Sequence, residues 1–189
     1  MTETPNPHIV DADSLTGEMH PIRRVVVALG SNLGERLASL QGAVDALADT
    51  PDFFVTGVSP VYETDPVESP EDAGPYLNAV LLADTTLPAA RLMERALAIE
   101  DAFERERSEI RNAPRTLDVD LVVVGDRRSN EDFLRLPHPR AHERAFVLQP
   151  WHDLEPDAVF PDRGPISELL QAADSTGVKK RDDLALDVE

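Results

Sequence analysis

The sequence contains no cysteine, and this absence excludes disulfide bridges and every metal site built on thiolates. Carboxylates and the five histidines remain as possible metal ligands. No stretch approaches the roughly 18 consecutive apolar residues of a membrane span. The N-terminus also lacks the basic region and apolar block of a secretory signal. These absences favour a cytoplasmic protein that does not bind a membrane.

Lysine is almost absent as well, since the two lysines of the chain are Lys179 and Lys180. The 36 acidic residues outnumber the 18 basic ones, and a net charge of −18 argues against binding to nucleic acid. All other cations are arginines, and four of them fall within residues 105–115. Such a cluster is a candidate site for a multiply charged anion. The glutamates between these arginines favour the alternative of a solvated helix face.

The 189 residues predict a single domain at residues 23–173, between a flexible acidic arm (1–22) and a flexible charged tail (174–189). Apolar runs predict four strands, and apolar residues at helical spacing predict a helix after the first strand and another after the third. This βαββαβ order with a C-terminal extension predicts an α+β, ferredoxin-like fold: a four-stranded, mainly antiparallel sheet with both helices on one face. The predicted strands are residues 25–29, 53–61, 76–83 and 118–124.

A long polar connection at residues 62–75 joins the second and third predicted strands, and a loop of this length is usually functional or mobile. Tyr76 and Asn78 follow it and share one face of the third strand. An amide inside a strand is costly unless its hydrogen bonds are satisfied. The pair is therefore either a strand-end tyrosine beside a solvated amide, or an aromatic ring and an amide that face a planar, hydrogen-bonding ligand.

Asp118 and Asp120 alternate with Leu117, Val119 and Leu121 in the fourth predicted strand. The apolar side chains can face the helices while the two carboxylates project from the opposite face, roughly 6–7 Å apart at the backbone. That spacing suits two Mg²⁺ ions bridged by phosphate oxygens, because metal removes the repulsion between the carboxylates. A solvated acidic face on an edge strand is the alternative. The arginines upstream favour the metal–phosphate site.

His138 lies in a proline-flanked turn, and Arg140, His142 and Arg144 follow it closely. A lone histidine is more often structural than catalytic, but these neighbours favour a loop that faces phosphate. We find no Ser–His–Asp order and no zinc-binding helix motif in the sequence.

Five motifs, in their order and spacing, resemble those of the 6-hydroxymethyl-7,8-dihydropterin pyrophosphokinase family of folate biosynthesis. Each motif is weak alone, but together they are specific and extend over about residues 24–162. The family transfers the β,γ-pyrophosphoryl group of ATP to the pterin hydroxymethyl group and releases AMP, so the resemblance implies this reaction. The motifs are A-L-G-S-N-L-G (28–34), V-Y-E-T-D-P (61–66), Y-L-N-A-V (76–80), P-R-T-L-D-V-D-L (114–121) and L-P-H-P-R-A-H-E-R-A-F-V-L-Q-P (136–150).

The resemblance implies a catalytic set of four charged residues and two Mg²⁺ ions as cofactors, with ATP as co-substrate. Asp118 and Asp120 look like the ligands of both ions. Arg105 and Arg115 resemble the arginines that clamp the transferring phosphates. The implied ATP-binding residues are Glu100, Arg105, Arg107, Arg115, His138 and Arg144.

The pterin site is also implied by the resemblance. Tyr76 and Phe146 are similar to the aromatic pair that sandwiches the pterin, and Asn78 resembles its amide partner. Two loops, at residues 66–74 and 105–115, correspond to the closing lids of the family. The implied pterin-binding residues are Thr64, Asp65, Val67, Tyr76, Asn78 and Phe146.

The chain departs from the family pattern in the second of these loops. The family usually has R-W-G-P-R there, and this chain has R-N-A-P-R, with Asn112 and Ala113. Ser108 stands where a lysine is common, and Pro139 where a tyrosine is often found. Losing an apolar cover and a cation predicts weaker lid closure with the chemistry retained. Asn112→Trp is then expected to lower the pterin KM or raise kcat, and unchanged kinetics would contradict this.

The favoured interpretation is a cytoplasmic, monomeric, Mg²⁺-dependent pterin pyrophosphokinase whose partners are ATP and the pterin, with neither nucleic acid nor membrane. One alternative is a non-catalytic, ferredoxin-like sensor of small molecules, in which the acidic pair is solvated surface. Another is a family member that keeps the pterin site but has lost activity through its altered loop. Formation of AMP from ATP, Mg²⁺ and the pterin separates the three.

Overall fold

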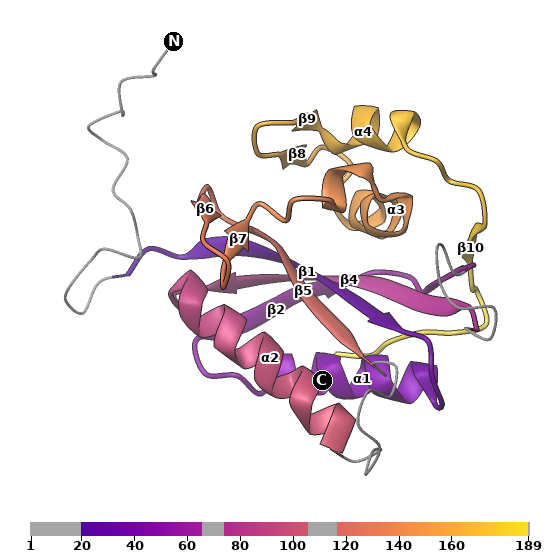
Figure 1. The fold of residues 1–189 in the computed structure, drawn as a ribbon, viewed down its shortest axis with the longest axis horizontal. Coiled ribbons are helices and arrows are strands. Elements are labelled where there is room, and N and C mark those ends of the chain that lie inside the picture. Colours follow the sequence, from indigo (N-terminus) through magenta and orange to yellow (C-terminus); the bar gives the residue numbers. More distant parts are fainter. Residues whose placement is uncertain (1–19, 66–73, 106–116, 189) are drawn as a thin grey trace.

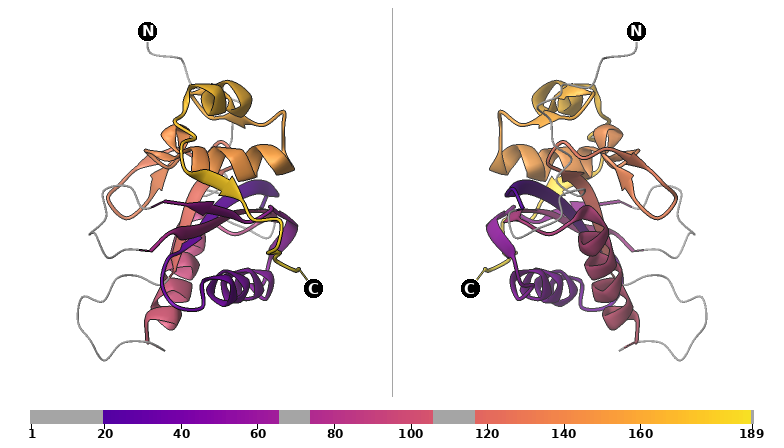
Figure 2. Two further views of the ribbon diagram at one scale, coloured as in Figure 1. Left: turned by 90° about the vertical axis from the view of Figure 1, so that its right-hand side faces the viewer. Right: turned by 90° about the vertical axis from the view of Figure 1, so that its left-hand side faces the viewer.

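Helices enclose a central β-sheet in the structure, a computed structural model that describes residues 20–65, 74–105 and 117–188, apart from the side chain of Arg105. The helices are α1 (Arg36–Ala48), α2 (Ala89–Arg105), the short 3-10 helix η2 (Ala141–Glu143), α3 (Ala145–Leu154) and α4 (Ile166–Ala172). α1 and α2 cover one face of the sheet, and α3 and α4 lie over the other face (Figures 1 and 2). No helix within the described ranges is long and apolar enough to span a membrane.

The central sheet has six strands among the described residues, and all of its pairings are antiparallel. Its strands are β1 (Arg23–Ser31), β2 (Phe53–Val58), β3 (Tyr62–Thr64), β4 (Tyr76–Thr85), β5 (Asp118–Val124) and β10 (Val178–Lys180). Their order is β10-β3-β4-β1-β5, and β2 also pairs with β4. Two small ribbons lie outside this sheet: β6 (Ser129–Asn130) with β7 (Arg135–Leu136), and β8 (Val159–Phe160) with β9 (Gly164–Pro165).

The central strand β1 contains a continuous apolar run because both of its faces are covered. Val25, Val26 and Val27 alternate between the two faces, yet each is at most 1% exposed. One core cluster packs the sheet against α1 and α2, and it includes Leu40 of α1. The other packs the opposite face against α3 and includes Trp151. The sheet is therefore the middle layer of three.

The predicted second strand, residues 53–61, is divided into two strands. β2 and β3 lie on either side of Pro60, which has no N–H group to donate to a neighbouring strand. Both segments pair with β4. The predicted loop at residues 62–75 therefore begins with three residues of sheet, and this pairing sets Thr64 opposite Tyr76.

The C-terminal extension departs most from the sequence prediction. A four-stranded sheet with helices on one face and a loose tail at residues 174–189 was the expectation. Instead, α3 and α4 cover the second face of the sheet, and β10 extends the sheet beside β3. The sheet has six strands rather than four because one predicted strand is divided and the tail contributes another. The mixed class with an antiparallel sheet is as the pattern of elements indicates, although the described residues form four α-helices and α3 was not predicted.

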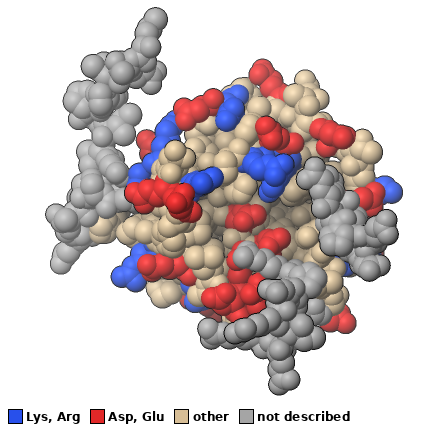
Figure 3. Space-filling model, in the orientation of Figure 1, with Lys and Arg blue, Asp and Glu red and all other residues tan. Residues whose placement is uncertain are grey.

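Charges of both signs are interspersed over the surface despite the net charge of −18. Figure 3 shows basic and acidic side chains beside one another over the same face of the molecule. Arg24 forms an ion pair with Asp84 at 2.8 Å, and Arg128 forms one with Asp162 at 2.6 Å. Such exposed pairs contribute little to stability, typically about 0–1 kcal/mol each.

Candidate active site

A cavity of about 450 Å³ opens on the face of the sheet that carries α3. The C-terminal end of β1 and the N-terminal ends of β4 and β5 form its base. Residues 64–65 lie on its rim. Residues from two later segments, 140–147 and 174–178, complete the enclosure, and together we call these segments the C-terminal wall.

The base of the cavity is ordered by strand register. Gly30 of β1 lies opposite Asp118 of β5 on one side and opposite Asn78 of β4 on the other. Ala28 lies opposite Asp120 in the same way. Residues opposite one another in a sheet project from the same face. We call these five residues the floor. Two carboxylates stand at one side of it and an amide at the other, with a glycine between them.

Gly30 keeps the middle of the floor open. A Cβ atom at this position would lie 3.3 Å from Oδ1 of Asn78 and 4.0 Å from Cδ1 of Tyr76. The first distance is closer than an ordinary van der Waals contact, so the amide would have to move to accept a side chain here. Glycine at this position therefore leaves room for a ligand to approach the backbone of β1.

The acidic pair projects away from the core, as its alternation with apolar residues predicts. Val119 and Leu121 are buried against α1 and α2, whereas Asp118 and Asp120 are half-buried and line the cavity. Within the described part of the chain, no three His, Asp or Glu side chains come together as a ready metal site. Mg²⁺ commonly takes one or two protein carboxylates and fills its other positions with water and phosphate oxygens. The donor set therefore fits Mg²⁺ bound together with a phosphate ligand.

The amide of Asn78 is buried and held in place by a neighbouring strand. Its Nδ2 donates a hydrogen bond of 2.8 Å to Oγ1 of Thr64, and the two side chains are 6% and 7% exposed. The alternative of a solvated amide is therefore wrong. Burial, with a further contribution from Asp118, raises the pKa of Tyr76, so its hydroxyl stays protonated at neutral pH. A neutral aromatic ring and an oriented amide thus lie side by side in the cavity.

An arginine and an aromatic ring stand together in the C-terminal wall. Cζ of Arg144 lies 5.6 Å from the centroid of the Phe146 ring, which is within the range of a cation–π contact. The backbone carbonyl of Arg144 accepts hydrogen bonds of 3.0 Å from the N–H groups of Val147 and Leu148, so the start of α3 fixes the backbone from which both side chains project. Arg140 also lines the cavity. The wall therefore offers two cations and a ring to a ligand on the floor.

His138 is not among the residues that line the cavity, but its turn is attached to β5. Its N–H donates to the carbonyl oxygen of Val122 at 2.8 Å, and its Nδ1 accepts from the N–H of Arg140 at 3.1 Å. Burial lowers the pKa of His138, and the charges of Arg144 and Arg140 lower it further, while Asp120 opposes them. The imidazole is therefore neutral at pH 7 and lies within the electrostatic reach of Asp120, Arg140 and Arg144.

Glu100 lies outside the cavity lining. Its Oε1 accepts a hydrogen bond of 2.8 Å from the N–H of Val119, the residue between the two aspartates, and the side chain is 6% exposed. In this position the carboxylate holds the backbone of β5 between the two aspartates. Its predicted contact with the nucleotide remains a prediction.

Three of the predicted site residues, Val67, Arg107 and Arg115, lie outside the described residues. Arg105 is the last residue of α2, and its side chain is likewise outside the description. The structure brings together the remaining predicted residues apart from Glu100 and His138, since they line one cavity: Thr64, Asp65, Tyr76, Asn78, Asp118, Asp120, Arg144 and Phe146.

Sequence reasoning missed the part of the wall that the C-terminal residues form. Asp174, Thr176 and Val178 line the cavity, although the sequence predicts a loose tail there. The signal that was available is the turn sequence D-S-T-G before a short run that begins with valine. The open floor at Gly30 was also missed, because a glycine at the end of a strand is indistinguishable from an ordinary turn residue.

Comparison with known proteins decides the family. The family model described as 7,8-dihydro-6-hydroxymethylpterin-pyrophosphokinase matches residues 26–156. This chain belongs to that family. A Pseudomonas aeruginosa protein named 2-amino-4-hydroxy-6-hydroxymethyldihydropteridine pyrophosphokinase is 40% identical over 159 residues, which cover 84% of this chain and 97% of the relative. A Mycobacterium bovis protein of the same name is 41% identical over 160 residues, which cover 78% of this chain and 82% of the relative.

Membership confirms the resemblance seen in the sequence motifs, and it makes the chain an enzyme, a pyrophosphokinase of the diphosphotransferase class. A solved structure of a Plasmodium falciparum HPPK-DHPS protein with pterin and p-hydroxybenzoate has a similar fold, with a TM-score of 0.62. The match covers 82% of this chain at 13% identity, and this chain spans 44% of that longer protein. At this identity the likeness supports the fold alone.

Proposed function

We propose that this pyrophosphokinase transfers the diphosphate group of ATP to 6-hydroxymethyl-7,8-dihydropterin in a Mg²⁺-dependent reaction of folate biosynthesis. The products are the pterin diphosphate and AMP. The curated relatives carry the name of a hydroxymethyldihydropteridine pyrophosphokinase, which supports the choice of acceptor.

The observation that carries the proposal is the arrangement of the floor and the neighbouring Tyr76. A carboxylate pair suited to Mg²⁺–phosphate and an aromatic–amide pair suited to a flat heterocycle lie in one cavity, on either side of Gly30. A reaction between a nucleotide phosphate and a hydroxyl group on a heterocycle needs these two sites side by side. The two neighbouring halves of the cavity thus support ATP as the phosphate donor and the pterin as the acceptor.

Asp118 and Asp120 would hold Mg²⁺, which supplies charge neutralisation for the phosphates when it is bound. Arg144 and Arg140 lie across the cavity, where their guanidinium groups can form ion pairs with the phosphate chain. Arg105 and Arg115 remain predicted phosphate clamps, and Arg107, His138 and Glu100 remain predicted ATP-binding residues.

The pterin ring would lie between Tyr76 and Phe146, because both rings line the cavity and come from opposite sides of it, the floor strand β4 and the wall helix α3. Oδ1 of Asn78 can accept a hydrogen bond from an N–H group of the heterocycle, while Nδ2 is held by Thr64. Asp65 and Thr64 stand at the rim, where the backbone can contact the ring edge.

In the chemical step, the hydroxymethyl oxygen forms a bond to the β-phosphorus of ATP, and the bond from this phosphorus to the α,β-bridging oxygen breaks. The electron pair of the broken bond stays on AMP, and the hydroxyl proton leaves to solvent. The chain contributes orientation and cationic stabilisation of the phosphates rather than a covalent intermediate.

We also infer that the fold is ferredoxin-like. Among the strands, the order β2-β4-β1-β5 with α1 and α2 on one face supports the ferredoxin-like arrangement. A monomer that acts in the cytoplasm, where ATP is available, is also part of what we propose.

The test is an assay of the full chain with ATP, MgCl₂ and 6-hydroxymethyl-7,8-dihydropterin, in which AMP and the pterin diphosphate are separated and quantified. Equal amounts of AMP and pterin diphosphate are expected, with no product in excess EDTA and recovery after Mg²⁺ is restored. Release of ADP in place of AMP would refute the diphosphate transfer. Pterin binding without any product would favour an inactive relative.

A further inference from the structure

The C-terminal residues 174–188, here called the strap, run from α4 along the edge of the sheet to α1 (Figure 1). Their middle part pairs with β3, with Val178 opposite Thr64. Their last part is fixed to α1, because the side chain of Gln41 donates to the carbonyl oxygen of Asp187 at 2.8 Å and accepts from its N–H group at 2.9 Å. The strap is thus attached to the fold at several points along its length.

The beginning of the strap is a tight turn on the cavity rim. The N–H of Thr176 donates to Oδ1 of Asp174 at 2.9 Å, and the N–H of Val178 donates to the carbonyl oxygen of Ser175 at 3.1 Å. Gly177 has φ +78°, a conformation that favours glycine, and a Cβ atom there would lie 2.9 Å from Oδ2 of Asp65. The turn is therefore packed directly against a residue of the cavity rim.

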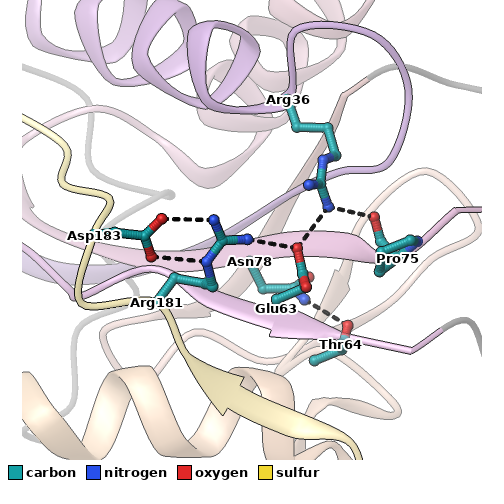
Figure 4. Close-up of polar contacts among 7 residues, drawn as sticks. All are labelled: Arg36, Glu63, Thr64, Pro75, Asn78, Arg181 and Asp183. Carbon is teal, nitrogen blue, oxygen red and sulfur yellow. Dashed lines mark hydrogen bonds and ion pairs between the residues drawn. The ribbon is translucent and has the colours of Figure 1, made fainter.

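An ion-pair cluster fastens the strap beside the heterocycle half of the cavity (Figure 4). Nη1 of Arg181 lies 2.8 Å from Oε2 of Glu63, and the same guanidinium binds Asp183 at 2.7 Å and 2.8 Å. The same Glu63 oxygen also accepts from Nη1 of Arg36 at 3.0 Å, and Arg36 donates to the carbonyl oxygen of Pro75 at 2.8 Å. One carboxylate thus joins the strap, β3 and the start of α1.

Two members of this cluster, Glu63 and Pro75, are next in sequence to residues of the cavity. Glu63 precedes Thr64, which holds the amide of Asn78, and Pro75 precedes Tyr76. Displacement of the strap would therefore disturb the aromatic–amide side of the cavity more than the acidic pair, which lies across β1 on β5.

We propose that the strap is a built part of the acceptor-binding site, and that Arg181 is a positioning residue that holds it against β3 through Glu63. This inference rests on the proposed function for the identity of the acceptor. Loss of the strap contact is expected to weaken binding of the planar heterocycle and to leave binding of the nucleotide unchanged.

Arg181→Ala in the full chain tests the proposal through steady-state kinetics with each substrate varied in turn. The KM for the pterin should rise about two- to fivefold, the range expected from loss of a partly exposed charge-assisted pair. The KM for ATP should stay within twofold. Arg181→Lys, which keeps a cation, should recover part of the effect. If Arg181→Ala does not fold, Asp183→Asn removes an exposed partner of Arg181 and should give a smaller shift in the same direction.

Arg128→Ala is the matched control, because Arg128 also forms a two-point pair with an aspartate, Asp162, away from the cavity lining. It should leave both KM values unchanged. Equal effects of Arg181→Ala and Arg128→Ala, or equal shifts in both KM values after Arg181→Ala, would show that the strap only stabilises the fold.

Pterin affinity, measured by fluorescence titration with Mg²⁺ and α,β-methylene-ATP, separates this proposal from the proposed function. Weaker pterin binding by Arg181→Ala supports the strap even if the wild-type chain forms no AMP. If the wild-type protein forms AMP but wild type and Arg181→Ala bind the pterin with the same affinity, the proposed role of the strap is wrong and the proposed reaction still holds.

Discussion

The floor and the C-terminal wall of the cavity are built in different ways. The floor uses neighbouring residues of three adjacent strands, so its geometry follows from strand alternation and register. The wall comes from a turn, a helix start and a strap that are distant in sequence from the floor and are held by individual contacts such as Arg181–Glu63. A rigid sheet can thus carry the carboxylate pair while less regular segments shape the space around it.

The largest expected effect comes from the acidic pair of the floor. Asp118→Ala and Asp120→Ala should each lower kcat/KM on the order of 10²–10³-fold or more, because each removes a proposed ligand of the Mg²⁺ that offsets the charge of the phosphates. The AMP assay at saturating Mg²⁺ measures the loss. Asp132→Ala, on an exposed loop outside the cavity, is the control. Full activity of either site variant would exclude its role as a metal ligand.

Phe146→Ala tests the wall in turn. The pterin KM should rise about tenfold or more, since stacking of an aromatic ring on a base contributes about 1–3 kcal/mol. The control is Phe54→Ala on β2, whose side chain is 66% exposed. If the wall only excludes solvent, Phe146→Ala would instead lower kcat with little change in the pterin KM. That result would contradict a stacking role for Phe146 and would leave pterin binding to the residues of the floor and Tyr76.

Gly30→Ala should weaken pterin binding about fivefold, because overpacking costs about 1 kcal/mol or more. The new Cβ atom would press on Oδ1 of Asn78 at 3.3 Å. Thermal unfolding should show little or no loss of stability, since alanine is favoured over glycine within a strand. Gly57→Ala is the matched control, because a Cβ atom there meets Leu154 at an ordinary 3.5 Å. Unchanged pterin affinity in Gly30→Ala would mean that the ligand does not approach this part of the floor.

The smallest expected effect is the pH dependence of stability from His138. Its pKa is lowered in the folded state, mainly by burial. As the pH falls below about 6.5, the unfolded chain takes up the proton first, so the free energy of unfolding decreases. His138→Gln should reduce this decrease between pH 8 and pH 5, as measured by urea unfolding. Identical slopes in wild type and His138→Gln would show that burial does not disfavour the charged imidazole.

Much of the candidate site was predictable because local sequence carries it. The alternation of Asp118 and Asp120 with apolar residues indicates which side chains leave the core, and the structure places both aspartates on the cavity side of β5. Tyr76 and Asn78 likewise share one face. The family motifs indicated the other residues of the predicted site, and the comparisons confirm the family.

The division of the second strand and the use of the tail were not predictable in the same way. Pro60 signals an interruption, but both halves still find the same partner strand. The strap is rich in charge, a composition that is typical of loose termini. Its order depends on Glu63 and Gln41, which are more than 100 residues away in the sequence.

The sequence by itself determined the type of enzyme, the α+β composition and the residues that leave the core, because these follow from short motifs and from the two-residue period of a strand. The tertiary structure decided which of those residues share one cavity, that a glycine separates the two halves of its floor, and that the tail closes its rim. These features depend on contacts between distant segments, and no local pattern specifies which segments will meet.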